Sequence, residues 1–201
     1  MRPKMSVCVV TYNQAAFVEQ CVASVAEQRT DFPYEIVVCD DASTDQTPAI
    51  LLGLQAKYGS LIRLALQKIN KGPTRTYCVA HRLARGDFIA HMDGDDYALP
   101  GKLQILHDTL IANPSANIVW HAMKRLSVDG KLHHGRKRMY LQPSGGFKLV
   151  HLLGYGTVGA HSSKAYRRSN RWLMGSPRHE VMDYYASVQH IAGGVGLWIP
   201  G

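Results

Sequence analysis

The sequence predicts an α/β protein with a mostly parallel, Rossmann-like sheet and helices on both faces. Short, continuously apolar segments alternate with segments of helical periodicity, which is the order expected of β-α-β units. Polar or acidic residues follow three of the apolar segments directly, and the chain of 201 residues contains no repeat or low-complexity segment. That length suits one domain of ordinary size, so residues 1–201 are expected to form a single unit.

Four apolar segments in the first half of the chain are expected to be buried parallel strands. Their residues are apolar without alternation, which is typical of strands covered on both faces. The segments span 7–10, 36–39, 62–66 and 88–92. Parallel neighbours need crossover connections, so a helix is expected between successive strands.

Four helices fit these connections. The first covers about 17–25 and has one apolar face. The second is expected to have Thr47 as its cap and Gly59 as its stop. The other two are expected at about 74–84 and from Pro100 onward.

The pattern becomes less regular after Pro114. We expect a strand at 118–120, a hairpin turn at 128–131, a polar loop at 133–146, a short helix at 147–153, a return to the sheet in 160–168, a helix at 183–192 and a last strand at 195–199.

The composition restricts the partners. The chain has 23 Lys and Arg against 15 Asp and Glu, a net charge of +8. The basic residues form no long run and no aromatic-interleaved motif, so no nucleic-acid binding is expected. The charge suits phosphorylated substrates or contact with anionic lipid.

The four cysteines form no C-x-x-C pair, which favours reduced thiols in a cytoplasmic protein. The N-terminus shows no signal-peptide pattern. No stretch approaches the roughly 18 apolar residues of a membrane span. We therefore expect a cytoplasmic protein, with peripheral contact at the inner face of the cell membrane as an option.

The strongest chemical signal is the acidic stretch Asp93-Gly94-Asp95-Asp96. Like charges this close repel one another and raise each other's pKa unless a cation lies among them. Hard divalent cations prefer oxygen ligands. The stretch follows an apolar strand, and in open α/β sheets ligands bind at the carboxyl ends of strands. We therefore expect a metal site formed by Asp95, Asp93 and Asp96.

Two other strands end in polar residues that are expected to reach the same edge. Thr11 and Tyr12 follow the first strand, and Asp40 and Asp41 follow the second. An aromatic ring that can stack on a base, a carboxylate that can accept from base or ribose, and a metal cluster together suit a nucleoside diphosphate.

Other nucleotide and metal sites fit less well. Residues 11–16 lack the glycines of a dinucleotide loop, and no Walker A sequence is present. An EF-hand loop starting at Asp93 requires Glu where this chain has Gln104. A phosphotransferase with Asp93 as nucleophile is the best rival, although Tyr97 departs from its usual motif.

Taken together, the motifs resemble the family 2 glycosyltransferases, which have the GT-A fold. The resemblance rests on order and spacing over about the first 115 residues. The segments that carry it are 9–13, 38–45, 70–72 and 93–96. It implies a nucleotide-diphosphate sugar as donor, with a UDP-sugar as first choice, a Mg²⁺ or Mn²⁺ ion, and inversion at the anomeric carbon.

The resemblance also implies roles for single residues. Tyr12, after Thr11, would pack on the nucleobase, and Asp41 would hydrogen-bond the base. Asp93 would lie near ribose and metal, and Asp95 would be the principal metal ligand, with Asp96 as an alternative. For Asp40, loop capping and a direct donor contact are equally good interpretations.

The second half resembles the family less closely. Residues 160–167 are similar to the segment before the acceptor region. Asp183 stands where relatives carry an acidic residue before a helix, a strand and a proline, which implies a general base. The alternative is an ordinary carboxylate at a helix N-terminus. Residues 1–115 would form a donor half and 116–201 an acceptor half.

Two departures leave an alternative open. Relatives often carry Ala-Arg-Asn where this chain has residues 76–78, so the arginine is either displaced to Arg75 or lost. The chain stops at Gly201, where relatives commonly continue, so the acceptor half is expected to be truncated. These points favour, as the second hypothesis, a non-catalytic protein that binds sugar nucleotides or polysaccharide.

By analogy with single-domain relatives, the expected setting is cell-envelope polysaccharide synthesis, with a glycan or lipid-linked acceptor. The sugar, the linkage and the oligomeric state do not follow from the sequence.

Overall fold

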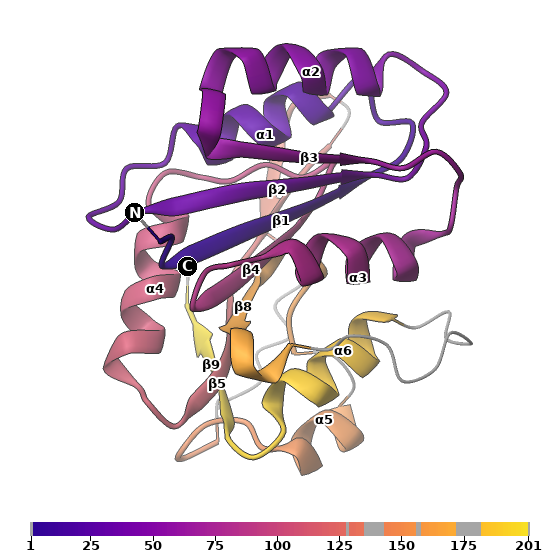
Figure 1. Cartoon of the computed structure of the whole chain (residues 1–201). Helices are drawn as coiled ribbons and strands as arrows, with labels where there is room; N and C mark the ends of the chain where they lie inside the picture. The colour runs from indigo at the N-terminus through magenta and orange to yellow at the C-terminus, as the bar shows by residue number, and fades with distance from the viewer. Residues whose placement is uncertain (1, 128, 135–142, 156–157, 172–181, 201) are drawn as a thin grey trace.

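A seven-stranded mixed sheet forms the centre of the molecule (Figure 1). The computed structural model describes residues 2–127, 129–134, 143–155, 158–171 and 182–200. The strand order is β3-β2-β1-β4-β8-β5-β9, and a separate two-stranded sheet consists of β6 and β7. The predicted α/β class with a mostly parallel sheet is confirmed.

The strands are β1 (Met5–Thr11), β2 (Tyr34–Asp40), β3 (Ile62–Leu66), β4 (Phe88–Asp93), β5 (Ala116–His121), β6 (Lys124–Leu126), β7 (Leu132–His134), β8 (Lys164–Arg167) and β9 (Val195–Ile199). The α-helices are α1 (Val18–Ala26), α2 (Thr47–Tyr58), α3 (Pro73–Leu83), α4 (Lys102–Ala112), α5 (Leu149–Tyr155) and α6 (Met182–Ile191). Three short 3₁₀ turns are η1 (Gly59–Leu61), η2 (His161–Ser163) and η3 (Arg168–Asn170).

Strand direction divides the sheet into two parts. β1 pairs in parallel with both β2 and β4, and β2 pairs in parallel with β3. β8 then lies antiparallel between β4 and β5, and β9 runs parallel to β5. The four predicted parallel strands are therefore contiguous, and β8, from the second half of the chain, pairs with them in the opposite direction.

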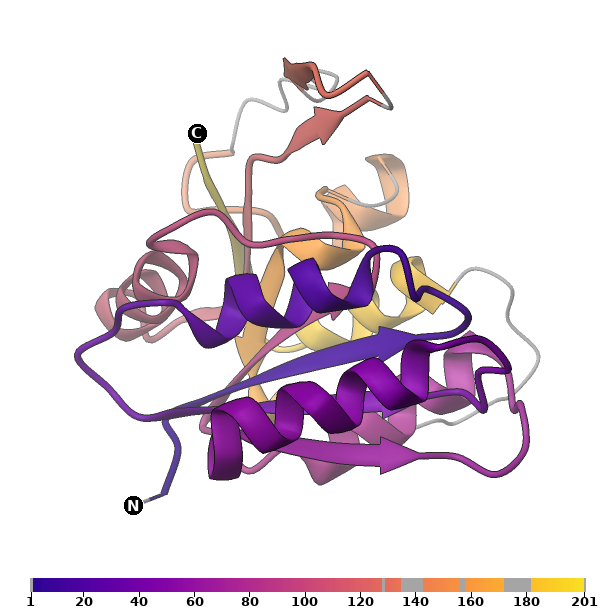
Figure 2. The same ribbon diagram turned by 90° about the horizontal axis from the view of Figure 1, so that it is seen from above.

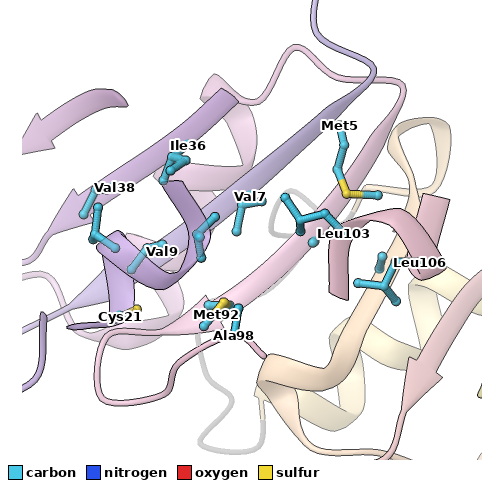
Figure 3. Close-up of a cluster of buried hydrophobic side chains, with 14 of the residues drawn as sticks. Met5, Val7, Val9, Cys21, Ile36, Val38, Met92, Ala98, Leu103 and Leu106 are labelled. Carbon is cyan, nitrogen blue, oxygen red and sulfur yellow. The ribbon is translucent and has the colours of Figure 1, made fainter. Parts of the chain in front are cut away.

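Two apolar layers enclose the sheet. On one face, α1, α2 and α4 pack against Val7, Val9, Ile36 and Val38, and Figure 3 shows part of this cluster. On the other face, α3, α5 and α6 cover a second cluster that contains Trp120. Alternate residues of each strand point to opposite layers, so both sets are apolar. This explains why the strands read as continuous apolar runs.

The start of α2 differs from the prediction. Thr47 is its first helical residue, and the N-cap position belongs to Gln46, whose side chain makes no capping hydrogen bond. The Asp45 carboxylate instead accepts from the main-chain N–H of Thr47 at 2.9 Å. The Thr47 hydroxyl accepts from the N–H of Gln14 at 3.0 Å, which ties α2 to the loop after β1.

The fourth helix also begins later than predicted. Gly101 has a left-handed backbone with φ of 84°, so helical geometry cannot start at Pro100. α4 begins at Lys102 instead.

The described segments of the second half follow the expected order, except that residues 133–134, expected in a polar loop, pair with β6 and belong to β7. The predicted hairpin is β6–β7, which stands away from the main sheet in Figure 2. The predicted return to the sheet begins with η2 and continues as β8. Among the described residues, no helix is long and apolar enough to cross a bilayer. The cysteines are all buried free thiols, and burial raises the pKa of Cys21 to about 12.

Candidate active site

The carboxyl ends of the three adjacent strands β2, β1 and β4 meet at one edge of the sheet, as predicted. Thr11 on β1 is in register with Asp40 on β2, and Val10 is in register with Asp93 on β4. The main-chain N–H of Asp41 donates to the Thr11 carbonyl at 3.0 Å, and that of Gly94 donates to Val10 at 2.9 Å. The predicted polar residues of these strands therefore lie in one region.

Asp41 is buried and holds the loop that precedes α3. One carboxylate oxygen accepts from the N–H of Lys71 at 2.8 Å and from the Gln67 amide at 3.0 Å. The other oxygen accepts from the N–H of Gly72 at 2.9 Å. The structure thus gives Asp41 a loop-fixing role, and its predicted contact with a nucleobase stays a prediction.

Asp40 has the contacts of a loop cap. Its carboxylate accepts from the N–H of Ser43 at 3.0 Å and from the Ser43 hydroxyl. The turn between them requires Ala42 at φ of 61°, an unusual value for a residue other than glycine. Of the two interpretations of Asp40, the capping contacts are the ones present, and a donor contact stays a prediction.

Gly94 leaves room for the end of β1. A Cβ atom at this position would lie 2.4 Å from Oε1 of Gln14 and 2.8 Å from the Thr11 side chain. Thr11 donates to the same Gln14 oxygen at 2.8 Å. The glycine in the acidic stretch is therefore required by packing against the first strand.

Tyr12 lies at the rim of the region. The residue is 46% exposed, so its ring is accessible to a ligand. The next residue, Asn13, has φ of 51°, and its side chain accepts from the N–H of Thr44 at 2.8 Å. The loops after β1 and β2 are thereby joined beside the Tyr12 ring.

The acidic stretch forms a tight turn, in which the N–H of Asp96 donates to the Asp93 carbonyl at 3.0 Å. The Asp93 side chain is 40% exposed and Asp95 is exposed. Burial and the neighbouring Asp93 and Asp95 charges raise the pKa of Asp96. Burial also opposes ionisation of Asp93, but hydrogen bonds from two histidines outweigh it and lower its pKa.

These two histidines and a serine were not found by sequence reasoning. His91 Nε2 lies 3.1 Å and His161 Nδ1 lies 3.4 Å from the same oxygen of Asp93. The Asp93 N–H donates to the Ser162 hydroxyl at 2.8 Å. Burial lowers the pKa of His91 to about 3 and that of His161 to about 4. A ring nitrogen of each histidine and an Asp93 oxygen lie within 4.8 Å of one another, a grouping that can hold a metal ion.

A sequence comparison agrees with this geometry. The family model described as "Glycosyl transferase family 2" matches residues 6–171, which include the three strand ends and the acidic turn. The chain belongs to this family.

Curated relatives of this family 2 chain include the uncharacterized protein Rv1520 of Mycobacterium tuberculosis. It is 35% identical over 197 residues, which cover 98% of this chain and 56% of the relative. The poly(ribitol-phosphate) beta-N-acetylglucosaminyltransferase TarS of Staphylococcus aureus is 38% identical over 100 residues, which cover 47% of this chain and 16% of TarS. The chain thus spans little more than half the length of Rv1520.

Solved structures show the same fold. The crystal structure of S. aureus TarS 1-349 superposes with a TM-score of 0.75 at 22% identity, covering 98% of this chain and 58% of that one. The mannosyltransferase PcManGT of Pyrobaculum calidifontis, in complex with GDP-Man and Mn²⁺, gives a TM-score of 0.77 at 22% identity, covering all of this chain and 55% of that one. The expected GT-A-type architecture of the family 2 chain is confirmed.

The position of the family's arginine has a different environment here. Tyr77 is fully buried and stacks on His81 with ring centroids 3.6 Å apart. Arg75 lies exposed on α3, two residues earlier. Tyr77 therefore belongs to the core, and both the displacement of the expected arginine to Arg75 and its loss stay predictions.

Asp183, the predicted general base, is the second residue of α6. Its side chain lies outside the described part of the structure, so its role stays a prediction. The basic residues 136–138 also lie outside the described residues.

Proposed function

We propose that this family 2 chain is an inverting glycosyltransferase. It moves a sugar from a nucleotide-diphosphate donor, with UDP-sugars as first choice, to a hydroxyl group of a glycan or lipid-linked acceptor. The observation that carries the proposal is the convergence of Asp41, the acidic turn 93–96 and the exposed Tyr12 ring at the carboxyl edge of parallel strands.

The donor end of the site suits a nucleotide. The Tyr12 ring is accessible for stacking on a base. Asp41 is buried at the end of β2, where its carboxylate accepts from the main-chain N–H groups of Lys71 and Gly72. Structural neighbours at low identity were solved with UDP-GlcNAc in TarS and with GDP-Man in PcManGT, which supports a nucleotide sugar without choosing the base.

The chemistry of the acidic turn fits a divalent cation. Asp93 is ionised and partly exposed, Asp95 is exposed, and like-charge repulsion contributes to the raised pKa of Asp96. A cluster of carboxylates supplies the oxygen ligands that Mg²⁺ or Mn²⁺ prefers. We assign Asp95 as the principal ligand, with Asp93 and Asp96 beside it. When bound, the cation supplies positive charge that stabilises the departing diphosphate.

In the proposed reaction, the acceptor oxygen forms a bond to the anomeric carbon while the bond from that carbon to the diphosphate oxygen breaks. Asp183 accepts the proton of the acceptor hydroxyl, and the electron pair of the broken bond leaves with the diphosphate. Proton transfer to a positioned carboxylate typically contributes about 10²–10⁴-fold to the rate.

Calorimetric titration tests the donor site. UDP, GDP and dTDP are titrated with and without Mn²⁺ into the wild-type chain, Asp95→Asn and the control Asp108→Asn, an exposed carboxylate on α4. We expect metal-dependent binding of one nucleotide that Asp95→Asn abolishes and Asp108→Asn retains. Failure of all three nucleotides under every metal condition would contradict the proposal.

A non-catalytic binding protein is the second candidate, favoured by the buried Tyr77 in place of the family's arginine. Turnover separates the two functions. Metal-dependent nucleotide binding without release of diphosphate or transfer to any acceptor would support the binding protein. Family membership favours both over a phosphotransferase, which would form an acyl phosphate on Asp93.

We also propose a cytoplasmic setting with peripheral contact at the membrane. The net charge of +8 supports attraction to anionic headgroups. Co-sedimentation with anionic vesicles, set against neutral vesicles, tests this contact.

A further inference from the structure

A series of hydrogen bonds leads from Asp93 into the core. His91 Nε2 is 3.1 Å from Asp93 Oδ1, and His81 Nε2 is 2.9 Å from His91 Nδ1. The Tyr166 hydroxyl in turn contacts His81 Nδ1. These residues come from β4, α3 and β8, so three separate elements meet behind the acidic turn.

The ionised Asp93 carboxylate at the end of the series fixes the direction of each hydrogen bond. An ionised carboxylate only accepts, so His91 donates to Asp93 through Nε2–H. A neutral imidazole has one donor and one acceptor nitrogen, so His91 Nδ1 accepts from Nε2–H of His81. His81 Nδ1 then accepts from the Tyr166 hydroxyl. One tautomer of each ring therefore satisfies the entire series.

Packing fixes the rings in place. His81, His91 and Tyr166 have no exposed side-chain surface. The Tyr77 ring stacks on His81 at 3.6 Å between centroids, and His190 stacks on Tyr166 at 3.5 Å. A ring flip would require these stacked neighbours to move.

A purely structural role explains the series poorly. Apolar residues of similar size would fill the same core without the cost of burying polar groups. A fully satisfied polar network instead selects one geometry, at the expense of that burial cost. In this protein the selected geometry is that of Asp93, the one member of the series that is partly exposed.

We propose that His91 and His81 are positioning residues that fix the Asp93 carboxylate for binding of the donor-associated cation. The inference rests on the proposed function. Both ring nitrogens of His91 contact protein groups, so we assign His91 to positioning Asp93; direct coordination within the grouping with His161 is the rival role. Among the described residues, the hydrogen-bond partner of Asp93 Oδ2 is the Ser162 hydroxyl at 3.3 Å. Outer groups of this kind typically change metal affinity by about 10–100-fold.

Nitrogen NMR of ¹⁵N-histidine-labelled wild-type protein tests the series without any ligand. We expect His81 and His91 both to carry a single proton, on Nε2. A proton on Nδ1 of His91, or on both of its nitrogens, would overturn the inference and would leave the proposed function untouched.

Mn²⁺ affinity tests whether His91 supports cation binding through Asp93. It is measured from the EPR signal of the free ion, in the presence of the nucleotide that the wild type binds. His91→Phe removes the donor to Asp93, and we expect about 10-fold weaker Mn²⁺ binding. His91→Gln keeps an amide N–H that can reach Asp93, and we expect it to restore most of the affinity. His107→Phe, on α4, is the matched control and should bind as the wild type does.

The outcomes separate the two proposals. If folded His91→Phe binds Mn²⁺ as tightly as the wild type, the role of His91 is contradicted and the proposed function is not. The same holds if His91→Gln binds Mn²⁺ as weakly as His91→Phe. A wild-type chain that binds no Mn²⁺ with any nucleotide contradicts the proposed function and, with it, this role.

Discussion

Oδ2 of Asp41 lies 2.9 Å from the main-chain nitrogen of Gly72, 31 residues later in the chain. Gly72 directly precedes α3 and has φ of 83°, and its main-chain N–H donates to the Asp41 carboxylate. The loop at residues 70–72 is therefore positioned by a side chain at the end of β2. The segments 38–45 and 70–72, which carry part of the family resemblance, are parts of one structure.

Asp41→Asn should disturb this loop. The amide oxygen can accept one set of hydrogen bonds, but the NH₂ group would face main-chain or side-chain donors, leaving buried groups unsatisfied. We expect a loss of about 1–3 kcal/mol in the free energy of unfolding. Urea denaturation measures it, with Asp31→Asn, at an exposed position before β2, as the control. Equal stability of both variants would show that the loop does not depend on the Asp41 carboxylate.

Gly94→Ala should damage the site through packing. The new methyl group would meet Gln14 Oε1 at 2.4 Å and Thr11 at 2.8 Å, so the loop after β1 or the acidic turn must shift. We expect a cost of about 1–3 kcal/mol in stability together with weaker nucleotide binding. Gly53→Ala in α2 is the control, because no atom lies within 4 Å of its Cβ position. Replacing a helix-interior glycine should add about 0.5–1 kcal/mol instead. A Gly94→Ala chain with wild-type stability would contradict the packing argument.

The fold of the first half could be predicted because its signals are local. Continuous apolar runs such as 36–39 are typical of strands with both faces covered, and two helix layers cover them here. β8 carries no such signal, since its four residues include Lys164 and Arg167. Its place between β4 and β5 depends on pairing across the chain, and a single sequence does not reveal that pairing.

In the candidate site too, the residues that form a local sequence pattern could be predicted, and those that come from distant parts of the chain could not. Asp93, Asp95 and Asp96 form a local pattern, whereas Ser162 reaches Asp93 from 69 residues away. His91 had a usable signal, because it stands two residues before Asp93 in one strand and so shares its face. Thr47 was wrongly predicted as a cap because a threonine at a helix start can also bond a distant loop, as it does with Gln14.

Stability should fall in mild acid. Among the described residues, burial holds the pKa of five histidines below the ordinary value of 6.5: to about 3 for His91, to about 4 for His121 and His161, and well below it for His81 and His190. Below pH 6.5 the unfolded chain binds protons that the folded chain does not, so unfolding becomes more favourable as the pH falls. Each histidine contributes a slope of about 1.4 kcal/mol per pH unit.

Urea denaturation at pH 7.5, 6.0 and 5.0 measures this dependence. His190→Phe keeps a ring against Tyr166 and removes one of the five titrating groups, so its stability should fall less steeply with decreasing pH. Constant stability of the wild type from pH 7.5 to 5.0 would show that these histidines are not held neutral.

Asp183→Asn should separate catalysis from donor binding. If Asp183 takes the acceptor proton, its amide cannot, and transfer should fall about 10²–10⁴-fold while nucleotide affinity stays within about twofold of the wild type. Release of the nucleoside diphosphate in the presence of an acceptor panel measures the rate, and calorimetry measures the affinity. The control is Asp108→Asn, which removes a carboxylate on α4 without affecting the strand ends. An equal loss of affinity and rate in Asp183→Asn would place this residue in donor binding, and an unchanged rate would assign the base to another group.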